Sequence, residues 1–120
     1  MRKLRSDITR EGLARTPHRA FMRAMGLDDA AIQKPMIGVV SMKGEQTPCN
    51  ITDGFQVKAA KEGVAEAGGT PREFTTISVS DGISMNHEGM KFSLVSRELI
   101  ADCEALFHIQ LARSSHAVDR

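Results

Sequence analysis

The feature that most constrains the fold is a strand pattern, then a helix pattern, then a second strand pattern. Residues 36–40, which follow Pro35, form a continuous apolar run typical of a strand buried on both faces. A helix is predicted over residues 52–67, because its apolar side chains share one face: Val57, Ala60, Val64 and Ala67. Gly68-Gly69 ends it, and residues 73–79 alternate as a second strand. This order predicts a parallel pair joined by a right-handed crossover.

Helical patterns flank this unit on both sides. The first begins at Thr16, predicted as the N-cap, continues through Pro17, and closes at Gly26 in a left-handed conformation. Asp28 is expected to start a further short turn. Another helix is predicted from Ser93, its expected N-cap, with one apolar face: Val95, Leu99, Cys103 and Leu106. The predicted fold class is therefore α/β, the N-terminal part of an α/β/α parallel-sheet domain ordered helix, strand, helix, strand, helix.

Charge and apolar patterning exclude several classes of protein. The chain has 16 basic and 15 acidic residues and a net charge of +1, which favours neither a nucleic-acid nor a membrane surface as partner. No apolar run approaches the roughly 20 residues of a membrane span. Residues 1–15 lack the apolar centre of a signal peptide and are predicted to form a polar arm. Cys49 and Cys103 are too few for a disulfide framework, so a cytoplasmic location is expected.

The two most polar segments of the chain follow the two predicted strands. Residues 41–50 follow the first strand, and residues 80–92 follow the second. Ligands of open α/β sheets bind outside the carboxyl ends of the strands. Both segments are therefore predicted to face one crevice.

Cys49 is one candidate for chemistry in this crevice. It lies between Pro48 and Asn50, just before the predicted central helix, and a helix N-terminus favours a thiolate. Such a thiolate acts as a nucleophile, a redox thiol or a metal ligand; the alternative is a small loop residue without a role. A nucleophile would need a base, for which His87 is the candidate.

Asp81 is the second candidate, because it directly follows the second predicted strand. A carboxylate on a strand-end loop is a common way to hold Mg²⁺. The alternative is a structural turn in which Asp81 is the cap and Gly82 takes a positive φ. His87-Glu88 has no second histidine at the spacing of a zinc motif. Arg97 is expected to form a local ion pair, although it could also meet a substrate carboxylate.

Several short motifs occur in a distinctive order: Thr47-Pro48-Cys49-Asn50, Glu66-Ala67-Gly68-Gly69, Val79 to Met85, His87 to Met90, and Ser96 to Asp102. Together they resemble the N-terminal part of the dihydroxy-acid/6-phosphogluconate dehydratase family, over about residues 5–102. The Ser96 to Asp102 run resembles the branched-chain dihydroxy-acid enzymes more than the sugar-acid dehydratases, which remain the alternative within the family.

The resemblance implies a hydro-lyase that removes water from a small 2,3-dihydroxy carboxylic acid. The product is a 2-keto acid on the route to valine and isoleucine. It also implies an iron–sulfur cluster, expected to be [2Fe-2S], with Mg²⁺ nearby, in a homodimeric enzyme. Carried onto this sequence, the resemblance makes Cys49 a cluster ligand and Asp81 a Mg²⁺ ligand.

The chain departs from the family pattern in what it does not encode. The family's other cluster cysteines, one in a Cys-Asp-Lys motif, and its catalytic serine have no counterpart here. No catalytic residue is therefore predicted, residues 1–104 are expected to be part of a dehydratase domain, and residues 105–120 a divergent tail. The chain is expected to be an inactive fragment on its own. Two alternatives are a non-catalytic module or split-enzyme partner, and a thiol catalyst that uses Cys49 and His87.

Overall fold

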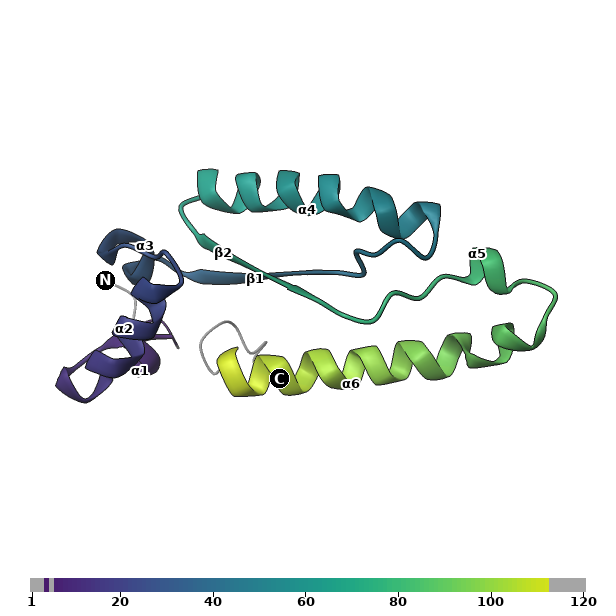
Figure 1. Cartoon of the computed structure of the whole chain (residues 1–120). Helices are drawn as coiled ribbons and strands as arrows, with labels where there is room; N and C mark the ends of the chain where they lie inside the picture. Colours follow the sequence, from purple (N-terminus) through teal and green to yellow (C-terminus); the bar gives the residue numbers. More distant parts are fainter. Residues whose placement is uncertain (1–3, 5, 113–120) are drawn as a thin grey trace.

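The centre of the molecule is a pair of parallel strands joined by one helix. The computed structural model describes residue 4 and residues 6–112. Strand β1 (Met36–Ser41) pairs in parallel with strand β2 (Thr70–Thr75), in a register that runs from Met36 opposite Thr70 to Ser41 opposite Thr75. Helix α4 (Pro48–Glu66) connects the strands and lies over one face of the pair (Figure 1). The predicted α/β class and its parallel crossover are confirmed.

Helix α4 begins earlier than the predicted start at residue 52. Thr47 is the N-cap, and its hydroxyl oxygen accepts a hydrogen bond from the backbone N–H of Asn50. Pro48 occupies the first turn, where its missing N–H costs nothing because that group has no partner inside a helix. The prediction was wrong because the apolar periodicity starts later than the cap does. Gly68, with φ of +85°, ends the helix as expected.

Strand β2 also begins earlier than predicted. The backbone N–H of Thr70 donates to the Pro35 carbonyl at 2.7 Å, so pairing starts directly after Gly69. The last ladder bond runs from the Thr76 N–H to the Ser41 carbonyl, because β1 ends there. The predicted strand at residues 73–79 was therefore placed too late, and residues 76–80 form the loop that leaves the sheet.

The N-terminal residues form a compact group of short helices. They are α1 (Asp7–Arg10), the 3₁₀ turn η1 (Leu13–Arg15), α2 (Thr16–Ala24) and α3 (Asp29–Gln33). Two predictions are confirmed here: Gly26 has φ of +84°, and Asp28 caps α3 by accepting from the Ala31 N–H at 2.7 Å. Thr16 is not the N-cap of α2, because its hydroxyl donates to the Leu13 carbonyl instead.

Arg10 ties this N-terminal group to the sheet. Its side chain is almost fully buried, pairs with the carboxylate of Asp7, and donates to the carbonyls of Ile32 and Lys34. These two carbonyls flank the end of α3, directly before β1. The prediction of a polar arm over residues 1–15 is therefore wrong for α1, which is held against the rest of the chain.

The C-terminal part lies on the other face of the strand pair. Helix α5 (Asp81–Ser84) and the 3₁₀ helix η2 (Glu88–Phe92) lead into α6 (Ser93–Ala112), which runs opposite α4 (Figure 1). Helix α6 continues through Glu104 without a break. The predicted division into a dehydratase domain over residues 1–104 and a divergent tail over residues 105–120 stays a prediction. Residues 113–120 lie outside the described residues. No helix in the described part of the chain is long and apolar enough to cross a membrane.

The apolar core is small for a chain of this length. Among the described residues, the buried hydrophobic side chains are Ile32 and Val57, which are 1% and 6% exposed. Much of the apolar surface of α6 is open to solvent, including Leu94, Val95 and Leu99. Polar contacts such as those of Arg10 therefore carry an unusual share of the tertiary organisation.

Replacing Arg10 by methionine should lower the free energy of unfolding by about 3 kcal/mol, because it removes a buried guanidinium that pairs with Asp7 and donates to the carbonyls of Ile32 and Lys34. Urea unfolding followed by circular dichroism measures this change. The control is Arg15→Met on a more exposed neighbour, which should change stability by less than about 0.5 kcal/mol. Equal effects of the two substitutions would contradict the anchoring role of Arg10.

Candidate functional site

The loops that follow β1 and β2 line one hollow at the carboxyl ends of the strands. Gln46 and Thr47 come from the first loop, while Ser80 and Asp81 come from the second. The start of α6 closes the hollow, whose volume is about 290 Å³. The Ser78 hydroxyl joins the two loops by donating to the Met42 carbonyl at 3.0 Å. The prediction that both polar segments face one crevice is confirmed.

Asp81 is held in this hollow by two donors from α6. Its Oδ1 accepts a hydrogen bond from the Ser93 hydroxyl, and its Oδ2 accepts from Nη2 of Arg97, both at 2.6 Å. Nη1 of Arg97 also donates to the Ser93 hydroxyl, which closes a three-residue network. The ion pair expected of Arg97 is therefore present, but it joins α6 to Asp81 at the start of α5 and is not formed within α6.

The backbone around Asp81 shows whether its carboxylate caps a turn or is available to bind a ligand. Ser80 is the residue that caps α5, because its hydroxyl accepts from the Gly82 N–H. Gly82 does not take a positive φ. The alternative in which Asp81 caps a glycine turn is therefore wrong. Ser93 is not the predicted N-cap either, because it is the first residue of α6 and already has helical backbone angles, with φ of −57° and ψ of −53°.

The hydrogen bond from Ser93, followed by that from Arg97, holds the pKa of Asp81 below its usual range. Both donors favour the charged form of the carboxyl group. An ionised carboxylate has about four lone-pair sites, and Ser93 and Arg97 occupy one on each oxygen. Asp81 is therefore a fixed anion that retains lone pairs for a cation.

Cys49 lies inside the first turn of α4 rather than in the loop before it. It follows Pro48, and its carbonyl accepts from the Thr52 hydroxyl at 2.8 Å. The residue is exposed, and neither Cys49 nor Cys103 forms a disulfide. Cys103 faces a different cavity, beside Phe74 and Leu99. Of the two cysteines, Cys49 is the one at the start of the helix that follows β1.

His87 is fixed by the backbone on both sides of its ring. Nδ1 accepts from the Gly89 N–H at 2.9 Å, and Nε2 lies 2.9 Å from the Ile83 carbonyl. Since a carbonyl can only accept and a backbone N–H can only donate, these partners make Nε2 the donor and Nδ1 the acceptor. Both nitrogens are engaged in shaping the α5–η2 connection, which leaves the alternative of a thiol catalyst without its base.

Two residues of the site were missed by sequence reasoning. Asn50 is 2% exposed, and its side-chain amide donates to the Met42 carbonyl at 3.0 Å while accepting from the Thr47 hydroxyl. A threonine followed three residues later by a hydrogen-bonding side chain is a capping signal that could have identified it. Ser93 gave no such signal as a partner of Asp81, because the two residues are far apart along the chain.

The residues described by the structure do not form a complete metal centre. Within that part of the chain, no three histidine, cysteine, aspartate or glutamate side chains lie close enough together to hold one ion. Asp81 and Cys49 are thus single potential ligands at the ends of two neighbouring strands.

Residues 34–119 match a family model described as the N-terminal part of dihydroxy-acid/6-phosphogluconate dehydratases. The chain belongs to this family. The matched segment contains β1, α4, β2 and the whole network around Asp81.

Known members of the family share much of this sequence. The chain is 79% identical over 109 residues to dihydroxy-acid dehydratase 3 of Bradyrhizobium diazoefficiens, which is 90% of this chain and 19% of that protein. It is 53% identical over 119 residues to dihydroxy-acid dehydratase 2 of Bordetella bronchiseptica, covering 99% of this chain and 20% of the relative. The chain thus spans about a fifth of the length of these dehydratases.

Removing the Ser93 hydroxyl should raise the pKa of Asp81, because that hydroxyl is the largest cause of its depression. A depressed carboxyl pKa contributes stability above the ordinary value and loses it as the pH falls through the folded-state value. Carbon-13 NMR titration of the Asp81 carboxyl group in Ser93→Ala measures the change. Ser96→Ala is the control, because the Ser96 hydroxyl donates to the Phe92 carbonyl and not to Asp81. The same pKa of Asp81 in both variants would contradict the network of Asp81, Ser93 and Arg97.

Proposed function

We propose that this chain is the N-terminal region of a hydro-lyase that acts on small 2,3-dihydroxy carboxylic acids. The reaction removes water and gives a 2-keto acid on the route to valine and isoleucine. The observation that carries the proposal is the 79% identity with a dihydroxy-acid dehydratase across nearly the whole chain. This identity favours the branched-chain reaction over that of a sugar-acid dehydratase.

We assign Asp81 as a Mg²⁺ ligand. Mg²⁺ prefers oxygen ligands, keeps several waters and is often held by one or two carboxylates together with its substrate. Asp81 suits this role because it is ionised, fixed by Ser93 and Arg97, and open to a hollow lined by hydroxyl groups. Arg97 acts as a positioning residue, since it orients the carboxylate through Oδ2.

We assign Cys49 as one ligand of an iron–sulfur cluster of the [2Fe-2S] type. The residue is exposed, forms no disulfide, and lies in the first turn of the 19-residue helix α4, where its sulfur is accessible to a metal. When bound, such a cluster supplies an iron that acts as a Lewis acid on the departing hydroxyl group. The chain's own contribution is to place this cysteine in the first turn of α4.

The remaining ligands must come from other residues of a whole dehydratase. A cluster of this kind takes about four protein ligands, whereas this sequence has two cysteines, of which Cys103 faces another cavity. We therefore propose that residues 1–104 form part of a dehydratase domain that is inactive alone. In the whole enzyme this region would belong to a cytoplasmic homodimer.

A chimera tests the proposed function. In it, this chain replaces the matching region of the Bradyrhizobium diazoefficiens relative, which is 79% identical. After anaerobic reconstitution with iron, sulfide and Mg²⁺, the chimera should convert 2,3-dihydroxyisovalerate into the 2-keto acid, while the 120-residue chain alone should show no turnover. A chimera that folds and binds its cluster but does not dehydrate this substrate would contradict the proposed reaction.

The two cysteines provide a matched pair within the same chimera. Cys49→Ser should abolish the visible absorption of the cluster and the bound iron and sulfide, whereas Cys103→Ser should leave them unchanged. Retention of a full cluster in Cys49→Ser would remove Cys49 from the ligand set without deciding the reaction.

A further inference from the structure

The outer edge of β1 can pair with a further strand. The Thr70 N–H donates to the Pro35 carbonyl, and the Thr76 N–H donates to the Ser41 carbonyl. Backbone groups of successive residues in a strand point to alternate sides. The N–H and C=O groups of Met36, Gly38 and Val40 therefore point away from β2, along the outer edge of β1.

The outer edge of β2 is different in kind. By the same alternation, Pro71 directs its nitrogen away from β1, so this edge lacks one donor for a ladder. Proline on an edge strand blocks pairing with further strands. Glu73, on the same edge, forms an ion pair with Lys61 of α4 at 2.8 Å. Of the two edges, that of β1 is the one suited to continue the sheet.

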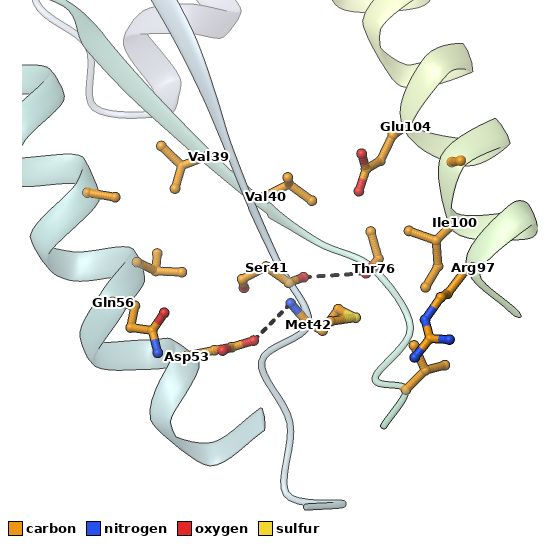
Figure 2. Close-up of a pocket in the computed structure, with 14 residues that line it drawn as sticks. Val39, Val40, Ser41, Met42, Asp53, Gln56, Thr76, Arg97, Ile100 and Glu104 are labelled. Atoms are coloured by element: carbon orange, nitrogen blue, oxygen red, sulfur yellow. Dashed lines mark hydrogen bonds between the residues drawn. The ribbon is translucent and has the colours of Figure 1, made fainter. Parts of the chain in front are cut away.

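A slot of about 650 Å³ lies beside the outer edge of β1. Figure 2 shows Val39 and Val40 of β1 between the two helices, with Gln56 of α4 on one side and Ile100 and Glu104 of α6 on the other. Val40 is 41% exposed. The Met42 N–H is already satisfied by Asp53, so the free edge ends where the loop begins.

The two helices also fix the direction in which the sheet must grow. Helices α4 and α6 cover opposite faces of the strand pair (Figure 1). Crossovers between parallel strands are right-handed, so a helix on the opposite face returns the chain past β1 to its free side. A strand that follows α6 therefore belongs beside β1, in the slot, and not beside β2.

We infer that the edge of β1 and this slot bind a third parallel strand, supplied by the polypeptide that follows this region in the full-length relatives. The strand order becomes β2, β1, third strand, and apolar side chains of the new strand occupy the space between α4 and α6. This places the loop after β1, together with the first turn of α4 that holds Cys49, at the point where the strand order reverses, which is where ligands bind in such sheets. The inference rests on topology and family membership, and it does not depend on the proposed reaction.

The test mixes this 120-residue chain with the part of the Bradyrhizobium diazoefficiens dehydratase that follows the matched region. A one-to-one complex is expected in size-exclusion chromatography with light scattering. In hydrogen exchange followed by NMR, the amides of Gly38 and Val40 should slow by about tenfold or more on binding, because they gain ladder partners. The amide of Val39, which already faces β2, should change less.

Substitutions in the slot make the test specific. Ile100→Arg places a charge between the helices and should weaken binding at least about tenfold, whereas Glu98→Arg, on the same helix and outside the slot, should leave binding unchanged. Circular dichroism checks that both variants fold alone, and Val40→Lys serves as a second slot variant.

Three results would overturn the inference: no complex, a complex without slower exchange at Gly38 and Val40, or unaltered binding by both slot variants. Self-association of the chain that protects these amides without the added polypeptide would also overturn it, because the edge would then belong to a second copy. These readouts involve no turnover, so their failure is distinct from failure of the proposed dehydration.

Discussion

Parallel pairing of β1 with β2 is the constraint on which the rest of the structure depends. The register from Met36 opposite Thr70 to Ser41 opposite Thr75 brings the carboxyl ends of both strands to the same level. Parallel strands require a crossover, which α4 provides, and the polar loops after both strands then line one hollow. The positions of Cys49 and Asp81 are both consequences of this single register.

The second notable property is that polar contacts hold a chain with little apolar core. Arg10 fastens the N-terminal helices to the start of β1, Asn50 fastens α4 to the loop after β1, and Ser93 and Arg97 fasten α6 to Asp81. Helix α6 still exposes large apolar side chains over most of its described length. The open edge of β1 and the slot beside it also belong to this incomplete packing. For this part of the surface, the topology indicates that a third parallel strand is the occupant.

Sequence patterns predicted the class and the order of elements because both depend on local signals. The apolar run of β1, the amphipathic centre of α4 and the left-handed Gly26 each act within a few residues. Boundaries were less predictable, because β2 starts where the Thr70 N–H meets the Pro35 carbonyl, a contact made through the fold. Asp81 could be selected from its place after a strand, but its partners on α6 could not, since only tertiary structure brings Ser93 and Arg97 to it.

The central claim is that these strand-end loops carry one part of a metal-dependent site, and Asp81 tests it most directly. Mn²⁺ is a paramagnetic substitute for Mg²⁺, and its binding to the dehydratase chimera can be titrated by electron paramagnetic resonance. Asp81→Asn should weaken Mn²⁺ binding by about tenfold or more, because the charged oxygen ligand is lost. Asp102→Asn, an exposed carboxylate on α6, should leave binding unchanged. Equal Mn²⁺ affinity in Asp81→Asn and the parent chimera would contradict the account.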